Sequence, residues 1–441
     1  IKFKPVELKA GKVKLENRYD FLNLNQFDLQ WQLLKDGQIV ESGVLSLGDA
    51  APNKDIEVTI PYKTALDAGS EYFLNLSARL KKDCNWANAG HEVASEQYSL
   101  TGKIAVAPVD TAFNDTLKVE EEKGQIGFRA PGFFIAFNPE TGKMVSLRYA
   151  GTDMIYNKEG FDFNWFRAMD NDKRDYLPTT VKKQAFDWKQ ATDKKSVTIT
   201  TSLEATVGSG TQKVVLPFDV TYTVYANGTV DIDATFKAGN DFNLPRLGLQ
   251  VALNPTLEQV EWYGRGPIEN YWDRKAGYMI GQYKSTAEEQ YFPYVRPQEN
   301  GHHCDTRWIS LGGKGKNLLI VADDEMEFNA MRNSVEDFDA GKATDRPYQW
   351  NNFTPEEIAN RPEIGPYDKP RQTHINDIAP RNFVEVCVDL KQQGLAGYDS
   401  WYSRPEPEYT LPADREYKWG FTLIPGAKAN SAQKKAGYSY K

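Results

Sequence analysis

Apolar and polar residues alternate with a period of two along most of this chain. Residues 27–33 show the alternation clearly and lead into Asp36-Gly37, a dipeptide typical of tight hairpin turns. Successive side chains of a β-strand point to opposite faces, so the pattern predicts strands with one buried face. The three-to-four-residue periodicity of helices is not sustained anywhere in the sequence. The chain is therefore expected to be all-β.

The alternation returns at short intervals. Residues 72–80 repeat it, and residues 218–224 and 230–236 flank Asn227-Gly228, which predicts a second hairpin. Further strands are expected at 126–137, 145–149, 196–206, 247–253, 317–323 and 383–389.

The spacing of these strands divides the chain at residues 103–115. Residues 1–104 have the length and the short strands of an immunoglobulin-like β-sandwich, and 105–111 reads as a linker. Residues 115–441 carry too many strands for a small sandwich, which predicts one large, curved β-sandwich of two sheets. The segment 339–381, dense in Pro, Asp and Asn, is expected to form a long loop at its edge or mouth.

Charge and reactive side chains exclude several classes of function. The net charge is −8 with no Lys/Arg stripe, so nucleic acid is not an expected partner, and no apolar run is long enough to cross a membrane.

Cys84, Cys304 and Cys387 are too dispersed for a disulfide framework and are predicted to be buried thiols. Their number leaves both cytoplasm and periplasm open as the compartment. The neighbours His302 and His303 would point to opposite faces of a strand, so no metal site is predicted.

Chemistry-bearing residues concentrate in Val260–Arg274 and Pro293–Gly301. A short apolar strand runs into the turn Gly264-Arg265-Gly266-Pro267, whose glycines allow backbone conformations closed to bulkier residues. Aromatic rings can stack on a pyranose while carboxylate, amide and guanidinium groups bond its hydroxyls, so the composition favours sugar binding. The polar residues that follow the turn are Glu269, Asn270, Asp273 and Arg274.

Both segments resemble the small-chain domain of bacterial glycoside hydrolase family 2 β-galactosidases. Four more segments match in order: Trp86–Gln97, Phe166–Asp172, Pro245–Leu249 and Gly397–Trp401. The second of them is similar to an Arg-Ala-Pro-x-Asp-Asn-Asp signature of the family but lacks its Pro. The resemblance implies that the first part is the family's fourth, immunoglobulin-like domain and the second its fifth, with a galactose-mutarotase-like β-supersandwich fold.

The resemblance also implies where the chemistry takes place. A retaining glycosidase needs two carboxyl groups roughly 5–5.5 Å apart, and in this family both belong to glutamates on a TIM barrel, which takes about 250 residues of alternating strand and helix. That alternation is absent from this sequence, so the chain is expected to be the last two domains of such an enzyme, with no catalytic residue and no cofactor of its own. The missing domains of the parent would bind Mg and Na. Expected partners are those domains, the galactoside and further copies of the parent in a homo-oligomer.

One aromatic residue and one acidic segment stand out among the matching motifs. The family's Trp at the position of Trp401 reaches the mouth of the active site and stacks on substrate, although a Trp in a β protein can equally be a core residue. Asp170, Asn171 and Asp172 resemble the start of a calcium loop, but Asp175 stands where such a loop requires Gly and Val181 where it requires a bidentate Glu. A loop tied by Asx hydrogen bonds, or one that supports the substrate mouth, is expected instead.

The remaining candidates form a pocket or a supporting network. Glu269 and Asp273 could be an acid/base pair, but Arg265 and Arg274 nearby would keep both ionised, which favours a structural network of ions and hydrogen bonds. The other members of this candidate set are Arg246, Asn270 and Asp399.

Two other functions stay open. The chain could be a stand-alone carbohydrate-binding protein that uses the surface of the supersandwich. It could also be an aldose epimerase, which needs a base and an acid around the anomeric carbon; His302 or His303 with Glu269 are the only candidates for that pair.

Overall fold

The computed structural model describes residues 1–103, 109, 111–122, 124–169, 172, 179–207, 214–237, 239, 243–338, 374–399 and 403–426. Strands dominate these ranges, and the helices among them are 3₁₀ turns of three or four residues, so the all-β prediction is confirmed. None of these helical turns is long and apolar enough to cross a membrane. The turns are η1 (Leu8–Ala10), η2 (Leu24–Gln26), η5 (Val335–Phe338), η8 (Ile375–Asp377) and η9 (Pro407–Tyr409).

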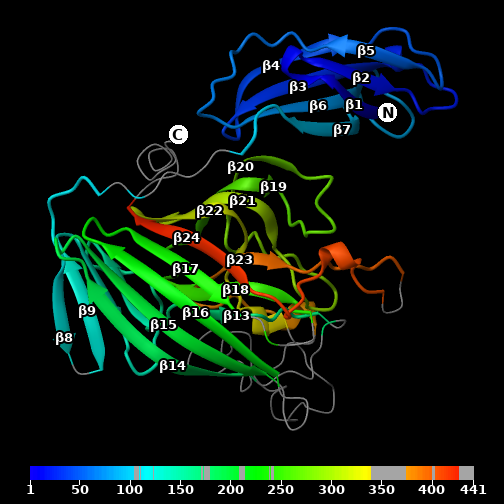
Figure 1. The fold of residues 1–441 in the computed structure, drawn as a ribbon. Coiled ribbons are helices and arrows are strands. Elements are labelled where there is room, and N and C mark those ends of the chain that lie inside the picture. Colours follow the sequence, from blue (N-terminus) through cyan, green and yellow to red (C-terminus); the bar gives the residue numbers. More distant parts are fainter. Residues whose placement is uncertain are drawn as a thin grey trace.

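The N-terminal part is a sandwich of two antiparallel sheets (Figure 1). One sheet has the order β1-β2-β5 and the other β4-β3-β6-β7, and apolar side chains from both fill a common core. Asp36 and Gly37 have φ of 49° and 78°, which suits the predicted hairpin turn between β3 and β4. The strands are β1 (Lys2–Glu7), β2 (Lys12–Glu16), β3 (Phe27–Lys35), β4 (Gln38–Ser46), β5 (Asp55–Thr59), β6 (Tyr72–Leu80) and β7 (Glu92–Ser99).

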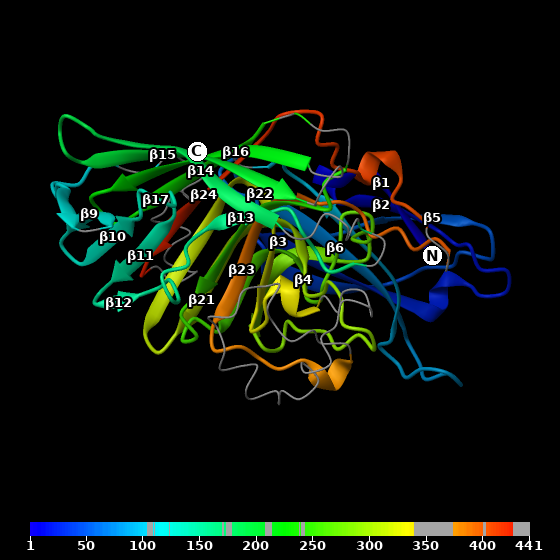
Figure 2. The same cartoon turned by 90° about the horizontal axis from the view of Figure 1, so that it is seen from below.

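The C-terminal part contains a five-stranded sheet and a twelve-stranded sheet that curls around a large apolar core (Figures 1 and 2). The smaller sheet has the order β12-β11-β10-β9-β8. Its strands are β8 (Lys118–Glu122), β9 (Gln125–Ala130), β10 (Phe133–Phe137), β11 (Met144–Tyr149) and β12 (Thr152–Asp153).

The larger sheet runs in the order β13-β18-β23-β22-β24-β17-β16-β15-β14, and β21, β19 and β20 extend from β22. This order brings β18, β23 and β22, which are distant in sequence, side by side. The strands are β13 (Asp162–Asn164), β14 (Thr179–Gln190), β15 (Ser196–Val207), β16 (Val214–Tyr225), β17 (Val230–Phe236), β18 (Arg246–Leu253), β19 (Gln259–Gly266), β20 (Met279–Thr286), β21 (His303–Gly313), β22 (Lys316–Met331), β23 (Val384–Gln392) and β24 (Tyr417–Pro425).

Several predictions about individual elements need correction. The single strand predicted at 126–137 is the hairpin β9–β10, because Gly132 takes a φ of 85° and reverses the chain. The strand predicted at 317–323 is only the start of the longer β22. Cys304 and Cys387 are buried as predicted, whereas Cys84 is exposed, because it lies in the loop between β6 and β7 where its backbone N–H donates to the carbonyl of Ala87.

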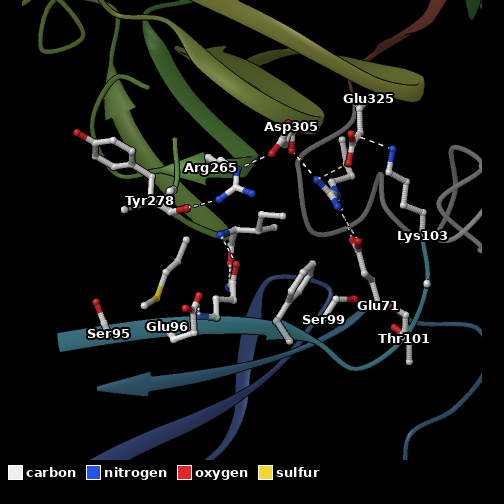
Figure 3. Close-up of a pocket in the computed structure, with 18 residues that line it drawn as sticks. Glu71, Ser95, Glu96, Ser99, Thr101, Lys103, Arg265, Tyr278, Asp305 and Glu325 are labelled. Atoms are coloured by element: carbon white, nitrogen blue, oxygen red, sulfur yellow. Dashed lines mark hydrogen bonds and ion pairs between the residues drawn. The ribbon is translucent and has the colours of Figure 1, made fainter. Parts of the chain in front are cut away.

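The two parts meet along β19–β22 (Figure 1). A small apolar cluster crosses the contact, and Gln97 bonds both the N–H and the C=O of Ile280 through its side-chain amide. Beside it, Glu71 forms an ion pair with Arg307, with 2.6 Å between Oε1 and Nη2. These groups line a polar cleft of about 500 Å³ (Figure 3). The cluster consists of Leu34, Phe73, Tyr263, Ile280, Trp308, Leu319 and Val321.

Two predictions from the sequence concern residues that the structure does not describe. The domain boundary at 103–115 stays a prediction, because residues 104–108 and 110 are outside the described ranges. Most of the loop predicted at 339–381 is also outside them, since the described chain stops at 338 and resumes at 374.

Candidate functional site

The described contacts converge on residues 393–396, here called the loop base, which follow β23 and lead into Tyr398 and Asp399. The buried side chain of Arg167 donates to the carbonyl oxygens of Gln393 and Gly394, the latter over 3.0 Å. Its Nε also lies 2.7 Å from the carboxylate of Asp172, which accepts a hydrogen bond from the Gln393 side chain. Arg167 and Asp172, from the matching segment Phe166–Asp172, therefore fix the start of the loop base.

Asp273 holds the end of the loop base. Its carboxylate accepts the backbone N–H groups of Leu395 and Ala396 over 2.9 and 2.7 Å. A Cβ on Gly394 would lie 2.5 Å from Asp273 Oδ2, so only glycine allows this close approach. Charge-assisted hydrogen bonds of this kind are roughly twice as strong as neutral ones. The turn segment 264–274 and the loop base are thus joined through one carboxylate.

Beyond the loop base the backbone turns sharply. Ala396 and Gly397 have φ of 58° and 82°, and the Gly397 N–H donates to Ser403 Oγ over 3.1 Å. This bond joins the two ends of the described chain on either side of residues 400–402. Trp401, the predicted sugar-stacking residue, belongs to that interval and lies outside the described residues.

A buried network around Arg246 lies next to the loop base. Arg246, the first residue of β18, is fully buried, and its Nε lies 2.8 Å from Asp389 of the neighbouring β23. Burial opposes the charge of the guanidinium, but its acidic neighbours, with Asp389 first among them and Glu299 contributing, together outweigh burial and raise the pKa of Arg246. Burial raises the pKa of Asp389 to about 6 in spite of that partner. Arg246 also contacts Asn329 and lies 3.7 Å from Glu299.

Glu269, Asn270 and Arg274 hold a different segment. Glu269 accepts from the Gly301 N–H over 2.8 Å and from the hydroxyl of Tyr294, and it pairs with Arg274 over 3.1 Å. Asn270 accepts the backbone N–H of Cys304 through Oδ1 over 2.9 Å. The turn predicted to bind sugar therefore fastens residues 301–304, at the start of β21, as well as the loop base.

The structure separates some candidates that sequence reasoning grouped. Glu269 and Asp273 bond to different segments, and Arg265 pairs with Asp305 instead of either of them. For the epimerase alternative, His302 Nε2 faces Glu327 over 2.9 Å, not Glu269, and both His302 and His303 are fully buried. Asp399 is exposed, while Asp170 and Asn171 lie outside the described residues.

Sequence reasoning missed most of the groups that hold the loop base. Asp389 carried no clear signal, because apolar and mostly polar residues alternate along β23 as in a strand with one exposed face, whereas the structure buries Asp389 completely. Glu299 lies in the segment Pro293–Gly301, but the sequence predicted no function for it. The side-chain amide of Gln392 donates to Glu299 over 2.9 Å. Nothing in the sequence positions of Gln392 or Arg167 predicted their contacts.

Replacing Asp273 tests whether it holds the loop base. We expect Asp273→Ala to raise the hydrogen-exchange rates of the Leu395 and Ala396 amides about 10- to 100-fold, because each loses a charge-assisted bond worth roughly 1.5–3 kcal/mol. Hydrogen exchange followed by mass spectrometry measures this directly. Asp414→Ala is the matched control, since Asp414 pairs at the surface with its neighbour Arg415. Unchanged exchange at both amides in Asp273→Ala would show that the loop base is held by other groups.

Two family models match this chain. The β-galactosidase small chain model matches residues 129–423, and the model of β-galactosidase domain 4 matches residues 13–101. Together they cover both parts of the fold described above.

Full-length relatives carry the same name. The β-galactosidase of Priestia megaterium is 32% identical over 440 residues, which are 96% of this chain and 38% of that protein. The β-galactosidase of Pseudoalteromonas haloplanktis is 26% identical over 92% of this chain and 37% of its own length. The chain thus spans less than two fifths of these relatives.

Solved structures show a more distant likeness. A GalM/aldose epimerase homologue from C. elegans aligns with 71% of this chain and 99% of its own, at 10% identity and a TM-score of 0.33. A galactose 1-epimerase from Lactobacillus acidophilus aligns with 72% of this chain and all of its own, at 10% identity and a TM-score of 0.29.

Proposed function

The chain belongs to the β-galactosidase small chain family, and from this premise we propose that it works as the C-terminal component of a larger, retaining glycoside hydrolase family 2 β-galactosidase. The proposed substrates are terminal β-galactosides such as lactose. The share of the relatives that the chain covers supports this division of labour, since more than half of each relative lies outside the match. The remaining domains would carry the two catalytic glutamates and bind Mg and Na.

In this proposal the chain completes the substrate pocket and does not cleave the glycosidic bond. The observation that carries it is the convergence of Arg167, Asp172 and Asp273 on the loop base that leads to Trp401. A rigid base positions a loop aromatic at little entropic cost, which suits stacking on a sugar ring. The carboxylates of this site are occupied by backbone N–H groups and cations, so their role is support.

Partners follow from the same proposal. The first partner is the rest of the enzyme, the second is the galactoside, and further copies of the whole enzyme would form a homo-oligomer. The alternative of a stand-alone carbohydrate-binding protein differs in one respect, because it would bind sugar without the other domains.

Truncation of Trp401 in the full-length enzyme tests the role of the loop. We expect Trp401→Ala to raise KM for a galactoside about tenfold, since loss of a stacking aromatic costs roughly 1–3 kcal/mol of binding, while the unfolding midpoint changes little. Trp86→Ala is the matched control, because Trp86 is exposed on the first part of the chain. If Trp401 were a core residue, truncation would instead cost roughly 3–5 kcal/mol of stability. Such a loss with unchanged KM would refute the substrate contact.

A further inference from the structure

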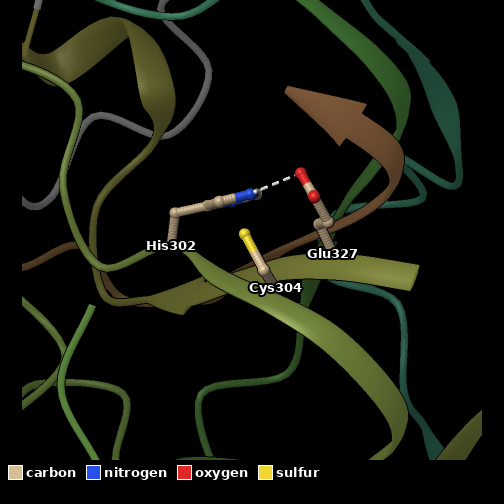
Figure 4. A group of neighbouring side chains, drawn as sticks. All are labelled: His302, Cys304 and Glu327. Carbon is tan, nitrogen blue, oxygen red and sulfur yellow. Dashed lines mark hydrogen bonds and ion pairs between the residues drawn. The ribbon is translucent and has the colours of Figure 1, made fainter. Parts of the chain in front are cut away.

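Three potential metal ligands meet inside the C-terminal part, beside Gln392 and the buried network around Arg246. His302, Cys304 and Glu327 are all buried, and one donor atom from each lies within 4.8 Å of the other two. Figure 4 shows the sulfur of Cys304 pointing into the space between the imidazole and the carboxylate. His302 immediately precedes β21 and Cys304 is its second residue, so the two side chains point to the same side, and Glu327 comes from the adjacent β22. The fold therefore gathers the three side chains.

The surroundings of these ligands carry an excess of buried negative charge. The carboxylates of Glu299, Glu327 and Asp389 are buried close together, and Arg246 is the guanidinium that faces two of them. Within the described residues, Glu327 Oε1 has no hydrogen-bond partner. A buried carboxylate oxygen without a donor costs free energy, which a bound cation would recover.

The ligand types and their orientation fit one kind of ion. Imidazole, thiolate and carboxylate are all ligands that suit Zn²⁺, and a structural zinc site takes all four of its ligands from the protein. Nδ1 of His302 lies 3.1 Å from the side-chain amide of Gln392 and 2.9 Å from Asn329 Oδ1, which orients the ring with Nε2 toward Glu327. The carbonyl oxygen of Asn270, 3.5 Å from Cys304 Sγ, or the second oxygen of Glu327 can supply a fourth ligand.

We propose that His302 Nε2, Cys304 Sγ and the carboxylate of Glu327 bind a structural Zn²⁺ ion that joins β21 to β22. Binding releases two protons to solvent, the one on the Cys304 thiol and the one between His302 Nε2 and Glu327, while His302 Nδ1–H keeps donating to Asn329 Oδ1. None of the three ligands is a residue proposed above to contact the sugar. It also departs from the sequence expectation of no metal site, which considered the pair His302-His303 and overlooked the spacing of His302 and Cys304.

Because the site is closed, the test loads the metal during folding. The full chain is unfolded with reductant and chelator, refolded with or without Zn²⁺, and freed of loose metal by gel filtration. We expect one zinc per chain by atomic emission and a thermal midpoint several degrees higher than that of the metal-free sample. Refolding with Co²⁺ should give a thiolate-to-cobalt charge-transfer band.

The cysteines supply matched controls, since the chain has only three. The double variant Cys84→Ser/Cys387→Ser keeps Cys304 alone, and we expect it to retain both the zinc and the cobalt band. Cys304→Ser and Glu327→Gln should each lower bound zinc at least tenfold, with the near-ultraviolet circular dichroism preserved.

Two results would overturn the site. One is the absence of metal and of the cobalt band from the double variant, which needs no substitution at the site itself and so cannot be blamed on misfolding of a Cys304 variant. The other is a zinc content that falls on removal of the exposed Cys84 and persists in Cys304→Ser, which would assign the metal to an adventitious surface thiol.

Discussion

Arg246→Met is expected to lower the free energy of unfolding by about 3–5 kcal/mol, because it leaves the carboxylates of Asp389 and Glu299 buried without their cation. Methionine keeps most of the side-chain length, so the lost stability reflects the missing charge and not a change in side-chain volume. Chemical denaturation of the variant, followed by tryptophan fluorescence, measures it. Arg415→Met is the control: Arg415 is exposed, and its loss should change stability by less than about 0.5 kcal/mol.

A double-mutant cycle separates the ion pair from general disruption. Adding Asp389→Asn to Arg246→Met removes one of the two uncompensated charges, so we expect the double variant to be more stable than the Arg246→Met single variant. Strictly additive losses would contradict the network described here, because they would mean that Arg246 and Asp389 act independently.

Glu71→Ala is expected to uncouple the two parts of the chain. Glu71 is buried at their contact, where it pairs with Arg307 through both oxygens and accepts from the hydroxyl of Tyr263. Removing one member of a buried pair costs about 3–5 kcal/mol, and contacts between domains are otherwise modest in size. Differential scanning calorimetry should therefore show two unfolding transitions for Glu71→Ala that lie further apart in temperature than those of the unsubstituted chain.

An exposed ion pair at the same contact provides the comparison. Lys103→Ala removes pairs with Asp324 and Glu325 at an exposed position, and such pairs contribute at most about 1 kcal/mol. If Lys103→Ala separated the transitions as far as Glu71→Ala does, burial of the Glu71–Arg307 pair would not be what couples the two parts.

Strands were predictable from the sequence where one face of the sheet is buried and the other is exposed to solvent. In β15, β16 and β17 buried residues alternate with partly exposed ones. The limits of β15 and β17 were predicted to within one residue, whereas the prediction for β16 began at 218, four residues after the strand starts. β23 and most of β22 are buried on both faces, so alternation gave no reliable end point, and the prediction stopped β22 at 323 when it continues to Met331. The order of strands in the curled sheet depends on long-range pairing that local periodicity does not contain.

The candidate site was predictable in its residue types but not in its connections. Asp172, Arg246 and Asp273 were singled out from three separate motifs, and the structure gives each of them a partner in β23 or the loop base. Which carboxylate meets which backbone N–H is decided by the approach of segments 100 or more residues apart. The i, i+2 spacing of His302 and Cys304 was readable, but their closeness to Glu327 depends on the pairing of β21 with β22.

The most direct test of the proposed function is an assay of the purified chain with a chromogenic galactoside, alone and after mixing with the separately expressed remainder of the enzyme. We expect no turnover by the chain alone, and β-galactosidase activity that appears on mixing and saturates at equimolar ratio. The Trp401→Ala chain should restore activity with a raised KM. Turnover by the chain alone that survives further purification, or a remainder that is fully active without the chain, would contradict the proposal that this chain completes the substrate pocket.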